Sequence, residues 1–184
     1  TLNYNSYNVN HQRNMVVSLF VENVLNSVTN QVTYDSETGG RTTMPVNLNG
    51  NWRASGSLSL SGPFNNRNWL FRTYSYLQYR NQNGYTTQNK EEPMKSSVQH
   101  LTARERLQLT FRTRQLELSA RGEVFYNNSY NNVKDMRTET FDYQLGGDLQ
   151  YYLPWGFECS SDLTYFLRTG YGSVSYTHLT LPTS

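Results

Sequence analysis

Apolar and polar side chains alternate with a period of two along most of this 184-residue chain. Between Val46 and Leu60 the even positions are apolar or small, and the odd positions between them carry only Asn, Arg and Ser. A helix would scatter these side chains around its surface, whereas a strand places them on opposite faces. The pattern therefore predicts long strands that are apolar on one face and polar on the other.

The same alternation predicts about eight strands. They cover Leu2–Val9, Met15–Tyr34, Val46–Leu60, Trp69–Tyr79, Leu101–Arg112, Leu116–Tyr126, Phe141–Leu153 and Phe157–Arg168. Within Met15–Tyr34 the apolar positions change from odd to even, which predicts a β-bulge, one extra residue near Glu22–Asn23.

The connections between these strands alternate in length. Short ones are expected at Asn10–Asn14, Gly62–Asn68, Thr113–Gln115 and Pro154–Gly156, and longer polar ones at Asp35–Thr43, Gln82–Ser97 and Asn131–Glu139. A transmembrane β-barrel sorts its connections in this way, with tight turns on the periplasmic side and longer loops outside. A soluble sandwich has no reason to do so.

Aromatic residues on the apolar face are spaced as a membrane would require. A strand tilted by about 40° climbs roughly 2.5 Å per residue, so ten residues cover the apolar band of about 25 Å. Trp69 and Tyr79 are ten residues apart on one face, and so are Phe141 and Tyr151. The predicted fold is all-β, an antiparallel transmembrane β-barrel fragment; the alternative is a large soluble β-sandwich or repeat protein.

One charged residue, Glu105, interrupts the apolar face, which it shares with Leu107 and Leu109. It lies about eight residues from the turn at Thr113, hence roughly 20 Å up the band, where the outer interface would tolerate a carboxylate.

Composition narrows the function classes. The chain is 36% hydrophobic with a mean hydropathy of −0.74, and it has no run of 18 apolar residues that could form a membrane helix. The formal charge of +2, without a basic run, argues against nucleic acid as a partner. A single cysteine, Cys159, excludes a disulfide framework and a cysteine metal cluster.

Charged residues gather on the predicted polar face. They are Arg53, Arg72, Arg80, Arg104, Arg106, Arg112, Glu117, Arg121, Glu123, Asp142, Asp148, Glu158, Asp162 and Arg168. Paired carboxylates invite a hydrolytic interpretation, but a wide barrel needs a polar wall because that wall faces water or a plug. We therefore expect no enzyme, and assign no catalytic, cofactor-binding or metal-binding residue. The residues that bind a substrate stay unassigned.

Three smaller features have ordinary explanations. Cys159 falls on the lipid face as a small apolar residue. The three His show no ligand spacing. The DSETGG segment from Asp35 could be a calcium loop, but a turn rich in Asp, Ser and Gly accounts for it.

Three stretches of the chain have sequences typical of a known family. They are VENVLNSVTNQVTYDSETGGRTTMPVNLNGNWRASGSLSLSGPF from Val21, LTARERLQLTFR from Leu101 and LELSARGEVFYNNSYNNV from Leu116. They resemble the barrel of TonB-dependent-receptor-like outer membrane proteins, most closely the subfamily with an N-terminal carboxypeptidase-regulatory-like domain. The resemblance extends over nearly all of Thr1–Ser173. The matching segments indicate the family but not the substrate.

The resemblance implies a location and partners. The chain would supply about eight strands of a barrel of about 22 around a plug, in the cell outer membrane of a Gram-negative bacterium. The partners would be outer-membrane lipid, the protein's own N-terminal plug domain, a TonB-type energy-transducing complex acting through the plug, and a surface lipoprotein. The implied function is energised uptake of a scarce nutrient; the alternative is a non-transporting barrel with a structural, adhesion or surface-anchoring role.

The last residues differ from the rest. Residues 174–184, VSYTHLTLPTS, resemble translated sequencing-adapter DNA, so we expect a partial barrel domain over residues 1–173 and a non-native tail over 174–184. The alternative is a genuine polar tail.

Overall fold

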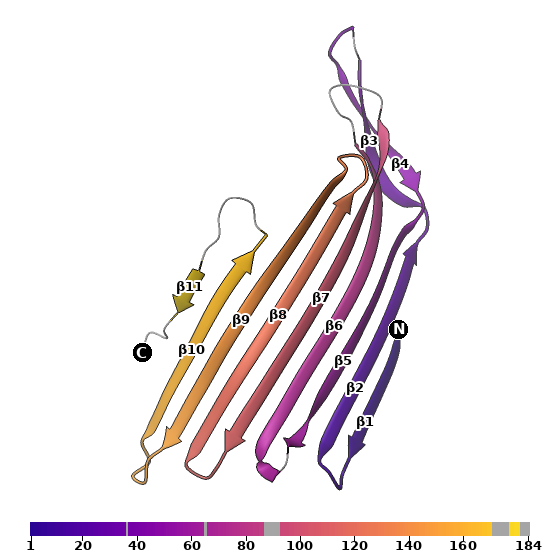
Figure 1. The fold of residues 1–184 in the computed structure, drawn as a ribbon. Helices are drawn as coiled ribbons and strands as arrows, with labels where there is room; N and C mark the ends of the chain where they lie inside the picture. The colour runs from indigo at the N-terminus through magenta and orange to yellow at the C-terminus, as the bar shows by residue number, and fades with distance from the viewer. Residues whose placement is uncertain (36, 65, 87–92, 171–176, 181–184) are drawn as a thin grey trace.

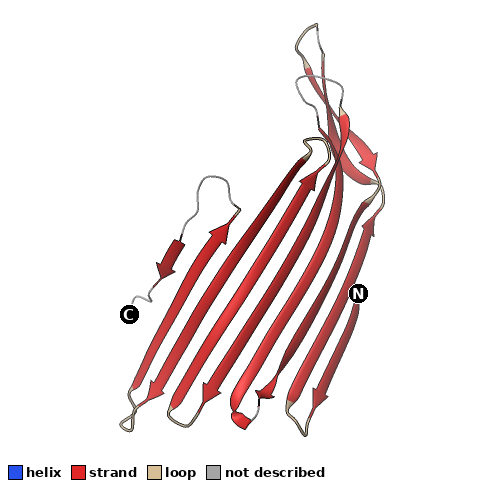
Figure 2. Cartoon of the chain, viewed as in Figure 1, coloured by secondary structure: helices blue, strands red, loops and turns tan. Residues whose placement is uncertain are grey.

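The computed structural model describes residues 1–35, 37–64, 66–86, 93–170 and 177–180. All regular structure in these residues is β-strand, and the strands are long (Figure 2). They are β1 (Leu2–Asn8), β2 (Arg13–Val24), β3 (Ser27–Tyr34), β4 (Arg41–Leu48), β5 (Asn51–Phe64), β6 (Asn66–Thr86), β7 (Met94–Arg112), β8 (Leu116–Asn131), β9 (Met136–Tyr152), β10 (Glu158–Thr169) and β11 (Thr177–Thr180).

Nine of these strands form one antiparallel sheet in the order β1-β2-β5-β6-β7-β8-β9-β10-β11. The other two, β3 and β4, pair with each other and rise beyond one end of that sheet (Figure 1). Apart from this hairpin, each strand of the sheet pairs with the next along the chain. The sheet is open, with β1 at one edge and β11 at the other.

The prediction of about eight strands was too low, because two predicted strands are each broken in the middle. Met15–Tyr34 divides at Leu25–Asn26, and Val46–Leu60 divides at Asn49–Gly50. Ten strands therefore precede the predicted tail, and β11 lies within it.

The predicted bulge at Glu22–Asn23 is wrong. The register between β2 and β5 runs without a shift from Asn14 opposite Ser61 to Val24 opposite Asn51. The apolar phase changes because the chain turns: Asn26 has φ 53° and Gly50 has φ 93°, values of the left-handed region that end both strands at the same level. The side-chain Oδ1 of Asn49 accepts the backbone N–H of Asn26 at 2.6 Å across this break.

The connections are sorted by end, but the longer ones differ from the prediction. Tight turns at Val9–Gln12, Thr113–Gln115 and Leu153–Phe157 lie together at one end (Figure 1). At the other end, β6 and β7 stay paired out to Thr86 opposite Met94, and β8 and β9 out to Asn131 opposite Met136. Strand pairing satisfies the backbone of these polar segments, so most of the predicted Gln82–Ser97 and Asn131–Glu139 loops are strand.

The predicted tail falls largely outside the described residues. Within it, Thr177–Thr180 form β11, which pairs antiparallel with β10 from Thr164 opposite Thr180 to Leu167 opposite Thr177.

Candidate functional site

The fourteen charged residues predicted for the polar face share one face of the sheet. Directly opposite residues in an antiparallel pair point to the same side, and the register links these positions from β5 across to β10. Arg53 lies opposite Arg80, Arg112 opposite Glu117, and Asp148 opposite Asp162. The predicted face is therefore a single polar surface.

Ion pairs between neighbouring strands cross this polar surface. Glu123 on β8 accepts Arg104 at 3.0 Å and Arg106 at 2.6 Å, both from β7. Arg53 on β5 pairs with Glu22 on β2 at 2.9 Å. Because these side chains remain partly exposed, each pair adds only about 0.2–1 kcal/mol. The pairs join β2 to β5 and β7 to β8 across the polar surface.

The most connected of these side chains is Arg121 on β8. Its Nη1 lies 2.8 Å from Asp148 Oδ2 on β9, and its Nη2 lies 2.6 Å from Asp162 Oδ2 and 3.0 Å from Thr164 Oγ1 on β10. The side chain crosses β9 over Gly146, where an added Cβ would lie 2.6 Å from Arg121 Nε. One guanidinium thus binds the two opposed carboxylates.

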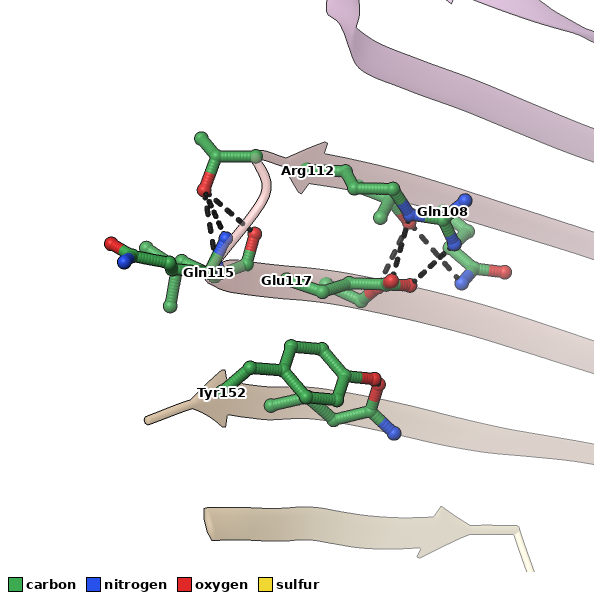
Figure 3. A network of polar contacts seen from close by, with 10 residues as sticks. Gln108, Arg112, Gln115, Glu117 and Tyr152 are labelled. Carbon is green, nitrogen blue, oxygen red and sulfur yellow. Dashed lines mark hydrogen bonds and ion pairs between the residues drawn. The ribbon is translucent and has the colours of Figure 1, made fainter. Parts of the chain in front are cut away.

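Another ion pair on the polar surface, between Arg112 and Glu117, lies near the tight turn between β7 and β8 (Figure 3). Arg112 and Glu117 form two parallel hydrogen bonds, Nε to Oε2 at 2.7 Å and Nη2 to Oε1 at 2.9 Å. The backbone N–H of Tyr152 donates to the carbonyl of Gln115 at 2.8 Å, which ties β9 to the same turn. This geometry is the strong bidentate form of an arginine–carboxylate pair.

The opposite face of the sheet is apolar and uncovered. Leu77, Leu107 and Leu145 are 55%, 58% and 62% exposed, and Leu48 is the only buried hydrophobic residue among those described. A soluble domain buries such side chains in a core, and an apolar surface of this extent marks a contact with protein or membrane.

Aromatic rings lie near both ends of the apolar face. Towards the β3–β4 end, ring centroids are 4.9 Å apart for Trp52 and Tyr79 and 4.6 Å apart for Tyr126 and Phe141. Towards the tight turns, Trp69 and Phe111 are 4.9 Å apart. The predicted positions Trp69 and Tyr79 thus each join a group of rings from neighbouring strands.

The aromatic rings near the β3–β4 end of the sheet, those of Trp52, Tyr79, Tyr126 and Phe141, change their register position from strand to strand. Trp52 lies opposite Asn81, two residues past Tyr79, whereas Tyr126 and Phe141 lie at the level of Leu77, two residues before it. Strands tilted to a common plane require this stepwise shift if their aromatic rings are to lie at one height.

Glu105 lies on the same face as Leu107 and Leu109. It is four residues from Leu101, which lies opposite Tyr79, and six residues from Phe111. At roughly 2.5 Å per residue of a tilted strand, its backbone is about 10 Å from the level of Tyr79. Its position relative to a membrane interface stays a prediction. The hydroxyl of Thr73 donates to Glu105 Oε1 at 2.8 Å.

The remaining predicted features lie as follows. Cys159 is exposed on the apolar face, opposite Tyr151. Among the described residues no group of three or more His, Cys, Asp or Glu could hold a metal ion.

The Asp35 segment forms the turn between β3 and β4. Asp35 Oδ2 accepts the Thr38 hydroxyl at 2.7 Å, and Oδ1 accepts the backbone N–H of Glu37 at 2.9 Å. The Thr38 hydroxyl, followed by this backbone N–H, holds the pKa of the Asp35 carboxyl below its usual value. The carboxylate is therefore engaged within the turn itself.

The sequence pattern missed Glu22 as a residue of the polar surface. The bulge predicted at Glu22–Asn23 left its face undefined, whereas the unbroken register places it opposite Arg53. The signal was its even position, because the apolar Val17, Leu19 and Val21 occupy the odd positions of the same strand.

No described helix is long and apolar enough to cross a membrane. No family model, curated protein or solved structure matches the chain.

Proposed function

We propose that this sheet is a section of the wall of an outer-membrane β-barrel, in a TonB-dependent-receptor-like protein that performs energised uptake of a scarce nutrient. The observation that supports it best is the uncovered apolar face, bounded by aromatic rings and backed by a continuous polar face. In this proposal the apolar face contacts outer-membrane lipid, and the polar face lines the lumen around the plug.

The energetics of the apolar face favour a lipid surrounding. Moving one large apolar side chain out of water stabilises a protein by about 1.5–3 kcal/mol. Many such side chains are left in solvent by the isolated sheet, among them Leu77, Leu107, Leu145 and Leu163. A bilayer covers all of them at once, whereas a soluble fold would need a second layer of comparable area.

The two edges of the sheet fit a section of a larger closed structure. An unpaired strand edge is a row of unsatisfied backbone groups, which hydrocarbon does not tolerate. In the proposed barrel of about 22 strands, further strands of the full-length protein pair with β1 and with the β10 side. In this proposal the wall binds and guides rather than performs chemistry, and the protein is a transporter, not an enzyme.

The uptake role is tested by capture of the energising partner. In cells that express the full-length protein with a photo-crosslinking residue at intervals along its periplasmic segment, we expect crosslinks to a TonB-type protein. Collapse of the proton-motive force should change their yield. A correctly folded barrel that yields no such crosslink would have the alternative structural, adhesion or anchoring role.

A further inference from the structure

Charge is distributed unevenly over the polar surface. Strands β5, β6 and β7 carry six of the eight arginines predicted for that face and none of its predicted acids. The six are Arg53, Arg72, Arg80, Arg104, Arg106 and Arg112. Four of these pair with a carboxylate of β2 or β8. The other two, Arg72 and Arg80 on β6, have no acidic partner among the described residues.

Arg80 has the more unusual surroundings of the two. It lies directly opposite Arg53 on one side and His100 on the other, so three basic side chains stand in one row across β5, β6 and β7. Like charges placed directly opposite each other destabilise a sheet. Arg72, by contrast, lies opposite Ser61 and Gln108.

Among the described residues, one carboxylate, that of Glu22, lies directly opposite a member of this row, and it pairs with Arg53 only. Glu22 Oε2 accepts Arg53 Nη2 at 2.9 Å, and the Arg53 guanidinium carbon lies 4.8 Å from the centre of the Phe20 ring. Phe20 and Glu22 thus hold Arg53 in place. Its Nε is buried and has no hydrogen-bond partner among the described residues.

Glu22, Arg53 and Arg80 line a recess of about 260 Å³, to which Ser27 and Gln82 add neutral polar groups. Its lining residues lie where β2 ends and where β3 and β5 begin. Figure 1 shows this end of the sheet, at the base of the β3–β4 hairpin and away from the tight turns. We propose that this recess is a binding site for an oxyanion, a carboxylate or phosphate group carried by the incoming ligand.

The chemistry of the recess fits that class of ligand. Arginine binds carboxylate and phosphate through charge-assisted, often paired, hydrogen bonds. An oxyanion between Arg53 and Arg80 offsets their mutual repulsion and gives Arg80 the acidic partner that it lacks among the described residues. The assignment to an incoming ligand rests on the proposed function, which places this end of the sheet outside the cell.

The test uses the full-length protein in detergent, with sodium citrate and sodium phosphate as probes and sodium chloride at matched ionic strength as reference. A ligand that binds the native state raises the unfolding temperature in a concentration-dependent way. We expect a rise with citrate or phosphate above that with chloride. Arg80→Gln should abolish the excess, whereas Arg72→Gln, on the same strand and face, should preserve it.

A second variant should strengthen oxyanion binding, a gain that misfolding could not produce. Glu22→Gln removes the competing carboxylate and frees Arg53, so about tenfold less citrate should give the same rise in unfolding temperature, as expected for one added charged hydrogen bond. The proposal is overturned if oxyanions act no differently from chloride, if Arg80→Gln keeps the excess, or if Arg72→Gln loses as much. The titration measures only oxyanion binding in the recess. A negative result would therefore not affect the proposal that the apolar face contacts lipid, which the nitroxide labels test separately.

Discussion

Replacing Leu145 with arginine is expected to destabilise the folded protein in a bilayer by about 2–4 kcal/mol, the cost of a cation near the membrane midplane. Leu145 is 62% exposed on the apolar face of β9. It lies four residues from Phe141 and six from Tyr151, between the two predicted aromatic levels. No acidic side chain lies directly opposite it, since its partners are Gly122 and Tyr165.

The neighbouring residue provides the matched control. Gln144 belongs to the polar face and lies opposite Glu123 on β8, so arginine there finds water and a carboxylate. Unfolding of the full-length protein by urea in lipid vesicles should show the large loss for Leu145→Arg and little change for Gln144→Arg. Equal losses in the two variants would contradict the assigned faces.

Removing the guanidinium of Arg121 is expected to have the next largest effect, roughly 1–2 kcal/mol. In Arg121→Gln the carboxylates of Asp148 and Asp162 remain directly opposite each other without their shared cation. The expected loss of stability is smaller than for a buried ion pair because the side chain of Arg121 is 32% exposed and that of Asp162 is 44% exposed.

The same vesicle unfolding measures this loss. Adding Asp148→Asn to the Arg121 variant removes one of the two repelling charges, so about half of the lost stability should return. If the double variant is no more stable than Arg121→Gln, the two carboxylates are not coupled through Arg121, and these two ion pairs do not stabilise the sheet.

The two faces of the sheet follow from the sequence because strand geometry alone fixes the alternation. A residue such as Leu107 faces away from Gln108 wherever the strand lies in the fold. The breaks at Asn26 and Gly50 are different: both depend on a positive φ, and the even apolar positions continue from Leu48 to Trp52 across the second break. Periodicity therefore joined segments that the backbone separates.

The contacts of the polar face depend on register, which local sequence does not encode. Arg121 and Asp162 are 41 residues apart along the chain and meet only because β8, β9 and β10 pair in one alignment. The row that places Arg80 opposite Arg53 has the same origin. The sequence thus predicts which residues share a face, whereas the structure is needed to determine which of them touch.

The central claim is that the apolar face contacts lipid, and site-directed nitroxide labels on β7 of the full-length protein in vesicles test it most directly. Leu107 and Leu109 belong to the apolar face, and Arg106 and Gln108 to the polar face. We predict that labels at Leu107 and Leu109 are relaxed by lipid-soluble oxygen and shielded from a water-soluble nickel chelate, and that labels at Arg106 and Gln108 are not accessible to oxygen in this way. Equal oxygen access at odd and even positions, or apolar-face labels shielded from both reagents as in a soluble core, would contradict the account.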